Sequence, residues 1–312
     1  MSCPCLRLLS AIASVALVTF VAPLRTFLPE STFAFTPPVP TTSCEPLNTR
    51  YRSDPTALLG IDVLVSYSRV LGDDHPDTAT ILNKLAMLYE SHGCYEEAEP
   101  FLQQALEIRR RVLGEDHPDT ATSLNNLAAL YGDQGRYGEA EPLYQQALAI
   151  RRKQLGDDHP STANSLNNLA FLYHFQGRTR EAEPLYQQAL EIRRRQLGDD
   201  HPNTATSLNN LAMLYQAQGR YGEAEPLLQQ ALEIRRRVLD DNHPDTAGSL
   251  NNLAGLYRIQ GRYGEAESLY QQALAITRKQ LGGNHPDTAI SLNNLAGLYR
   301  IQGRYGEAES LY

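Results

Sequence analysis

The residues of this sequence best suited to chemistry are acids and histidines gathered in a short motif, first written GDDHP at residues 72–76. Two carboxylates beside an imidazole could hold a metal ion or shuttle a proton. The motif recurs as GEDHP, GDDHP, DNHP or GNHP, and its histidines stand 42 residues apart, at His75, His117, His159, His201, His243 and His285. A site is usually made once, so a motif that recurs with its surroundings indicates a structural unit.

The unit around each motif has the pattern of a helix hairpin. In the copy at 117–158, apolar residues recur at helical spacing from Leu124 to Tyr131, which predicts one face of a first helix. Gly135 ends that helix, and a second amphipathic helix begins near Gly138. One hairpin cannot cover its own apolar face, so neighbours must stack. The predicted class is an all-α solenoid of stacked antiparallel helix hairpins.

The histidine motif lies where each first helix starts. Pro118 suits the first helical position, His117 or a nearby acid can cap the helix, and Asp119 complements the positive end of the helix dipole. Equivalent histidines should lie roughly 10 Å apart, one helix layer, whereas Zn–N bonds are about 2 Å long, so neighbouring motifs cannot share one ion. We therefore expect helix caps, with no metal and no other cofactor.

Basic triplets, such as the one at residues 109–111, stand near the end of each second helix. Their charge complements the negative end of the helix dipole. Anion binding is the alternative for these triplets, but the helix-end role accounts for them without a ligand. We expect Arg109, Arg110 and Arg111 on the outer layer, where substitution is tolerated.

The repeat resembles that of a known family. Its pattern, L-x-x-L-A-x-L-Y…G-x-Y-x-E-A…L-Y-x-x-A-L, is similar to the tetratricopeptide repeat, and the 42-residue length, LNNLA and the LG-x-DHPDTA connector resemble the kinesin-light-chain type. The resemblance covers about residues 73–312. It implies a right-handed superhelix whose first helices line a concave groove. The chain departs from that family in lacking a heptad coiled coil for binding a motor heavy chain.

The pattern divides the chain into four parts. Residues 73–312 are predicted to hold six repeats, the last of them truncated, and residues 53–72 resemble a degenerate second helix that caps the array. Residues 35–52 are rich in Pro and Thr, as is typical of a linker. The apolar run within residues 1–34 favours a signal peptide, with an uncleaved anchor or an early start codon as alternatives. The chain is exported if this leader is a signal peptide, and otherwise cytoplasmic.

Differences among the copies indicate where a ligand would lie. Several positions on the far side of the first helix vary, whereas one asparagine there is constant. A fixed amide can pair with any peptide backbone, while variable neighbours can read side chains. The resemblance places this side in the groove. The candidate residues are Asn83, Asn125, Asn167, Asn209, Asn251, Asn293, Phe171, His174, Phe175, Met213, Arg258 and Arg300. The alternative for the asparagines is that they brace adjacent repeats.

These features favour a non-enzymatic scaffold that binds a protein or peptide partner in the groove. The formal net charge of −8 gives no indication of nucleic-acid binding, and membrane contact is expected only through an uncleaved leader. His92 and Cys94 stand close together, but no third residue orients them as a catalytic pair. The alternative function is a sensor or targeting array that is a fragment of a larger multidomain signalling protein, with an NTPase or protease domain elsewhere.

Overall fold

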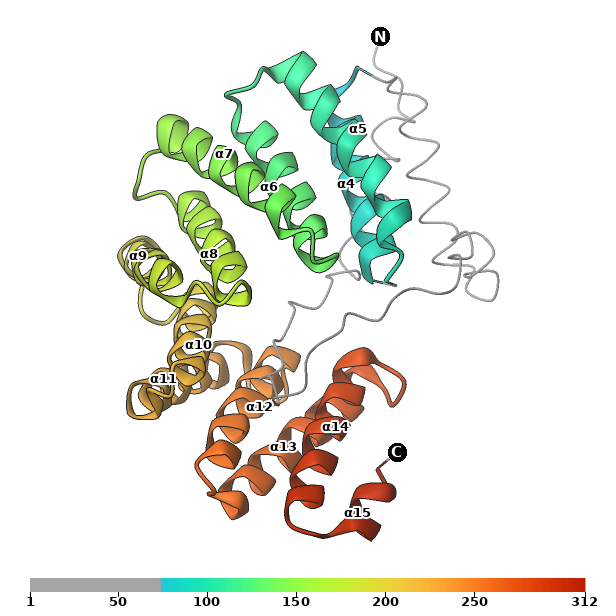
Figure 1. The fold of residues 1–312 in the computed structure, drawn as a ribbon, viewed down its shortest axis with the longest axis vertical. Helices are drawn as coiled ribbons and strands as arrows, with labels where there is room; N and C mark the ends of the chain where they lie inside the picture. Colours follow the sequence, from blue (N-terminus) through green and yellow to red (C-terminus); the bar gives the residue numbers. More distant parts are fainter. Residues whose placement is uncertain (1–73, 92, 312) are drawn as a thin grey trace. The chain divides into compact units, whose positions relative to one another are not determined.

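The computed structural model describes residues 74–91 and 93–311, and their regular structure is entirely helical (Figure 1). The first helices of the hairpins are α4 Pro76–Ser91, α6 Pro118–Asp133, α8 Pro160–Phe175, α10 Pro202–Ala217, α12 Pro244–Ile259 and α14 Pro286–Ile301. The second helices are α5 Tyr95–Leu113, α7 Tyr137–Leu155, α9 Thr179–Leu197, α11 Tyr221–Leu239, α13 Tyr263–Leu281 and α15 Tyr305–Glu309. The all-α prediction is confirmed.

Three of the predicted parts fall outside the described residues. They are the signal peptide or leader at 1–34, the linker at 35–52 and the capping helix at 53–72. The described chain itself divides into two compact units, residues 74–157 and 158–311. Within the described residues, no helix combines the length and the apolar character that crossing a membrane requires.

Local sequence sets the ends of each helix. A proline occupies the start of each first helix, where its missing amide breaks no intrahelical bond. The turn inside a hairpin passes through a glycine with positive φ, such as Gly135 at 73°, and the loop between hairpins through another, such as Gly156 at 90°. Asp240 holds that second position in one copy with a φ of 88°, and no other described non-glycine residue has a positive φ.

The core of each unit is built from apolar residues that occupy equivalent positions in successive hairpins. Ala121 and Leu124 of α6 and Ala140 and Tyr144 of α7 are buried within one hairpin. Within each unit, the second helix of one hairpin also packs on the first helix of the next, as α5 does on α6 and α9 on α10. Stacked antiparallel hairpins are therefore confirmed as the fold.

Successive first helices also lie against one another. In the first unit α4 contacts α6, and in the second unit α8 contacts α10, α10 contacts α12 and α12 contacts α14. Each unit therefore presents one face composed of first helices, and a second, separate face composed of second helices.

Candidate partner-binding surface

The six histidines of the recurring motif are helix caps. In every copy, imidazole Nδ1 accepts a hydrogen bond of 3.1–3.2 Å from the backbone N–H two residues later. This N–H is one of the first-turn donors that an α-helix leaves without an internal partner. The capping prediction is confirmed. The described residues contain no group of three or more histidine, cysteine or acidic side chains that could hold a metal ion.

The acids of the motif form ion pairs with the basic ends of second helices. Asp158 accepts a hydrogen bond of 2.6 Å from Arg195 of α9, and Asp199 lies 3.2 Å from Nε of Arg194. Both pairs are well exposed, so each contributes about 0–1 kcal/mol. The acids of the motif therefore pair with the end of the second helix that precedes the motif and with the end of the second helix in the hairpin that follows it.

The first arginine of each basic triplet lies in the core, so the expectation of an outer position for the triplet at 109–111 is wrong for Arg109. The buried Arg109 guanidinium donates to the backbone oxygen of Asp119 at 3.0 Å and to Ser123 Oγ at 2.9 Å, both on α6. It also donates to Thr80 Oγ1 on α4 at 3.1 Å. Burial lowers the pKa of Arg109, and attraction to Asp119 partly opposes that shift. One side chain of α5 thus ties together two first helices.

The same bridge recurs in later copies with one informative exception. Arginine is buried at the equivalent position and donates to a side chain 29 residues earlier, in the pairs Arg151–Thr122, Arg193–Asn164 and Arg235–Thr206. In α13 the position is Thr277, and the residue 29 positions earlier is Gly248. The donor and its acceptor are lost together. This covariation is visible in the sequence of the single chain and is the signal that could have revealed the bridge.

Four of the constant asparagines lie between adjacent first helices. Asn209 donates to Ser249 Oγ at 3.2 Å, Asn251 donates to Ser291 Oγ at 3.1 Å, and Asn167 accepts from Asn210 at 2.8 Å. Asn83, Asn167, Asn209 and Asn251 are buried, Asn125 is half-buried and Asn293 is exposed. These bonds support the bracing alternative for the buried asparagines. Contact between the constant asparagines and a partner stays a prediction.

The variable apolar residues form a patch at the end of α8. The ring centroids of Phe171 and Phe175 are 4.5 Å apart, and those of His174 and Phe175 are 5.9 Å apart. Phe175 is 45% exposed, and Met213 is half-buried on the neighbouring helix α10. Burial lowers the pKa of His174, which keeps its imidazole neutral near pH 7. The structure therefore brings together the aromatic candidates that the sequence singled out.

The two variable arginines sit further along the second unit. Arg300 is exposed at the end of α14, whereas Arg258 is half-buried at the end of α12. The buried Tyr270 hydroxyl has no partner at hydrogen-bond geometry, yet Arg258 is near enough to oppose the rise that burial causes in the pKa of Tyr270. Arg258 therefore faces its own hairpin in part, and Arg300 is the freer of the two to meet a partner.

An arginine at five of the described hairpin turns forms a second contact that the sequence did not reveal. The Arg136 guanidinium lies 4.0 Å from the centroid of the Tyr131 ring, and it bonds Glu99 of the preceding hairpin and Glu139 of its own helix, each at 2.7 Å. These bonds raise the pKa of Arg136 and lower that of Glu139. The ring contact repeats at Arg178, Arg220, Arg262 and Arg304, each over the tyrosine five residues earlier. Arg220, Arg262 and Arg304 also bond a glutamate of the preceding hairpin at 2.7–2.9 Å and so join neighbouring hairpins.

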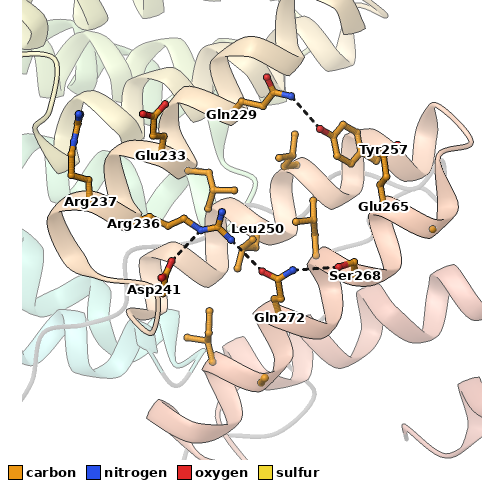
Figure 2. Close-up of a pocket in the computed structure, with 16 residues that line it drawn as sticks. Gln229, Glu233, Arg236, Arg237, Asp241, Leu250, Tyr257, Glu265, Ser268 and Gln272 are labelled. Atoms are coloured by element: carbon orange, nitrogen blue, oxygen red, sulfur yellow. Dashed lines mark hydrogen bonds and ion pairs between the residues drawn. The ribbon is translucent and has the colours of Figure 1, made fainter.

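A hollow of about 1290 Å³ lies on the second-helix face, between α11 and α13 (Figure 2). Leu250 and Leu253 of α12 line its floor. Arg236 of α11 pairs with Asp241 at 3.2 Å and donates to Gln272 Oε1 of α13 at 3.2 Å, so a polar bridge crosses it. The lining is therefore apolar at depth and polar at the rim.

Two shortened side chains accompany this hollow. The α13 lining residues Ser268 and Ala275 stand where α11 carries Pro226 and Glu233. They are seven residues apart and so share one face of the helix. The hollow therefore accompanies differences between copies of the second helix. The predicted partner-binding surface was based on differences in the first helix.

The enzymatic alternative has little support from the described residues. Cys94 is buried at the start of α5 and disulfide-bonded, so it offers no free thiolate. His92 lies outside the described residues.

The repeat geometry and a family comparison define the class. A model of the tetratricopeptide repeat matches residues 61–110, 77–153, 125–195, 165–237, 203–279 and 245–312. The chain therefore belongs to the tetratricopeptide repeat family. Its solved neighbours assign its repeats more narrowly to the kinesin-light-chain-like type. Proteins of this family are generally non-enzymatic scaffolds for protein–protein interaction.

Two solved structures illustrate the likeness. BtubC (BKLC) from P. vanneervenii is 27% identical with a TM-score of 0.59, covering 70% of this chain and 87% of that one. A structure from Podosopora anserina, described as a kinesin light chain with nearly identical TPR-like repeats, is 34% identical with a TM-score of 0.54, covering 66% and 98%. No curated protein matches the chain.

Proposed function

We propose that this chain is a scaffold that binds a protein or peptide partner along the first-helix face of its hairpins. The observation that carries this proposal is where the copies differ. The bonding residues of the turn and core recur in most copies, whereas an exposed position at the end of the first helix changes from Phe175 to Ala217 to Ile259. Variation on a fixed framework is expected where side chains select a ligand rather than hold the fold.

The chemistry of this face suits a partner with apolar side chains. Phe175, Ile259 and Ile301 occupy one equivalent position at the ends of first helices, and all three are exposed large hydrophobic residues. A few well-packed anchor residues, aromatic ones above all, carry most of the affinity in typical interfaces. The proposed contact set is Phe171, Phe175 and Met213, with Arg300 as the charged candidate at the far end of the second unit.

A matched pair of variants tests this assignment. Phe175 on α8 and Val238 on α11 are both 45% exposed, but they lie on the first-helix and second-helix faces respectively. A partner is first captured with the whole chain, and its affinity is then measured for Phe175→Asp and Val238→Asp. We expect Phe175→Asp to weaken binding about ten-fold or more, and Val238→Asp to change it by less than about two-fold.

The opposite ranking would place the partner on the second-helix face and overturn the proposal. A third variant, Ala275→Glu, identifies the hollow of Figure 2 as the site if it abolishes binding, because it installs the side chain that α11 carries there. Circular dichroism melts of all three variants confirm that each still folds.

A further inference from the structure

The six histidine caps differ in the residue that donates to them. Four of the donors are aspartates, Asp77, Asp119, Asp245 and Asp287, whereas His159 and His201 accept from Ser161 and Asn203. We propose that His159 and His201 form an acid-sensitive pair of caps, whose protonation loosens the starts of α8 and α10. This inference does not depend on the proposed function, because it concerns the stability of the two helices that carry Phe171, Phe175 and Met213.

The hydrogen bond itself requires a neutral imidazole. Nδ1 can accept the N–H of Ser161 or Asn203 only while it carries no proton, and both bonds are 3.1 Å long. Protonation turns this acceptor into a donor and adds a positive charge at the positive end of the helix dipole. Histidine is the side chain that ordinarily makes this change between pH ~5 and ~8. Protonation therefore replaces a cap with a repulsive contact.

The aspartates compensate for that change in the other four copies. The carboxylate lies 3.6 Å from Nδ1 in the His75–Asp77 pair and 3.7 Å in His117–Asp119. It lies 3.9 Å away in His243–Asp245 and 3.7 Å in His285–Asp287. A protonated imidazole in these copies gains a nearby anion as it loses its capping bond. After His159 and His201, the side chain two residues later is Ser161 or Asn203, and neither carries a charge.

The acids that directly precede the two sensitive caps are already paired. Beside His159, Asp157 pairs with Arg152 at 3.1 Å and Asp158 with Arg195 at 2.6 Å. The equivalent acids beside His201 pair with arginines of α9 and α11, in Asp199–Arg194 and Asp200–Arg237. The buried Arg193 of α9 donates to the backbone oxygen of Asn203 at 3.0 Å, which brings a further positive charge to the start of α10. No unpaired carboxylate among these groups can take up the charge of the protonated caps.

Hydrogen exchange of the whole chain tests the proposal with an internal control. Exchange is followed by mass spectrometry at pH 7.5 and pH 5.5, with rates corrected for the intrinsic effect of pH. We expect the first turns of α8 and α10 to lose protection about five-fold more than those of α6 and α12, which is the factor that one helix cap typically represents. Equal loss in all four helices would overturn the proposal.

Variants that exchange residues between copies give the matched controls. Ser161→Asp and Asn203→Asp supply the missing carboxylates and should bring α8 and α10 to the behaviour of α6. Asp119→Ser should make α6 acid-sensitive. His174 lies at the other end of α8, so His174→Gln should leave the first-turn effect in place. Acid sensitivity that persists in the two aspartate variants, or that disappears in His174→Gln, would show that the caps are not its source.

Discussion

The guanidinium of Arg193 on α9 donates a hydrogen bond of 2.7 Å to Ser207 Oγ on α10, and both side chains are buried. The same group reaches the backbone oxygen of Asn203 at 3.0 Å and Asn164 Oδ1 on α8 at 2.8 Å. Burial lowers the pKa of Arg193 to about 10, which leaves it charged at neutral pH. A charge held in the core by three oxygens fixes how one hairpin stacks on the next.

Removing this arginine should destabilise the array far more than removing its exposed neighbour. Arg193→Ala leaves Ser207 and two other acceptors without their charged donor, and we expect a loss of about 3 kcal/mol in the free energy of unfolding. Arg195→Ala removes exposed ion pairs to Asp158 and Glu191 and should cost less than about 1 kcal/mol. Urea melts of both variants measure the difference. Equal losses would contradict a structural role for the buried bridge.

Replacing the strained loop residue Asp240 with glycine should stabilise the fold. Its φ of 88° is unfavourable for a residue with a side chain, and other copies place glycine there, as at Gly198 with a φ of 91°. Asp240 Oδ1 accepts a 2.6 Å bond from the Asn242 N–H, which offsets part of the strain. We expect Asp240→Gly to raise stability by about 0.5–1 kcal/mol in a thermal melt, and the reciprocal Gly198→Asp to lower it. A lower melting temperature for Asp240→Gly would show that the side-chain bond outweighs the strain.

His174 should contribute to the acid sensitivity of α8. Because burial lowers its pKa in the folded chain, the unfolded chain takes up this proton first. The folded chain keeps its full stability above the ordinary histidine pKa of ~6.5. It loses stability as the pH falls from there toward the lower pKa that His174 has in the folded chain. His174→Gln installs the residue that α10 carries at Gln216 and should shrink the stability difference between pH 7.5 and pH 5.5. Melts at the two pH values check this, and an unchanged difference would contradict it.

The local pattern was sufficient to predict the hairpins. Each helix is specified by residues within it or next to it. In α6 these are Pro118 at the start, the apolar stripe from Leu124 to Tyr131 and Gly135 just after the end, and the same pattern predicts the other copies. The histidine caps were predictable for the same reason, because cap and donor are two residues apart.

Contacts between hairpins were harder to predict because they depend on direction around the helix. Arg109, Arg110 and Arg111 are adjacent in sequence but point about 100° apart, so only Arg109 enters the core while Arg110 reaches Glu115. The constant asparagines were placed on the correct helix, yet the burial of four of them between neighbouring helices was only one of two alternatives. The hollow between α11 and α13 depends on two copies at once, so no single copy shows it.

The central claim, that a partner binds the first-helix face, is tested most directly by mapping the surface that a captured partner protects. Hydrogen exchange is measured by mass spectrometry for the whole chain alone and saturated with its partner, and protection is compared between first and second helices. The account predicts protection concentrated on α8 and α10, around Phe171, Phe175 and Met213, with α11 and α13 nearly unchanged. Protection confined to α11 and α13, along the hollow lined by Arg236 and Gln272, would contradict it.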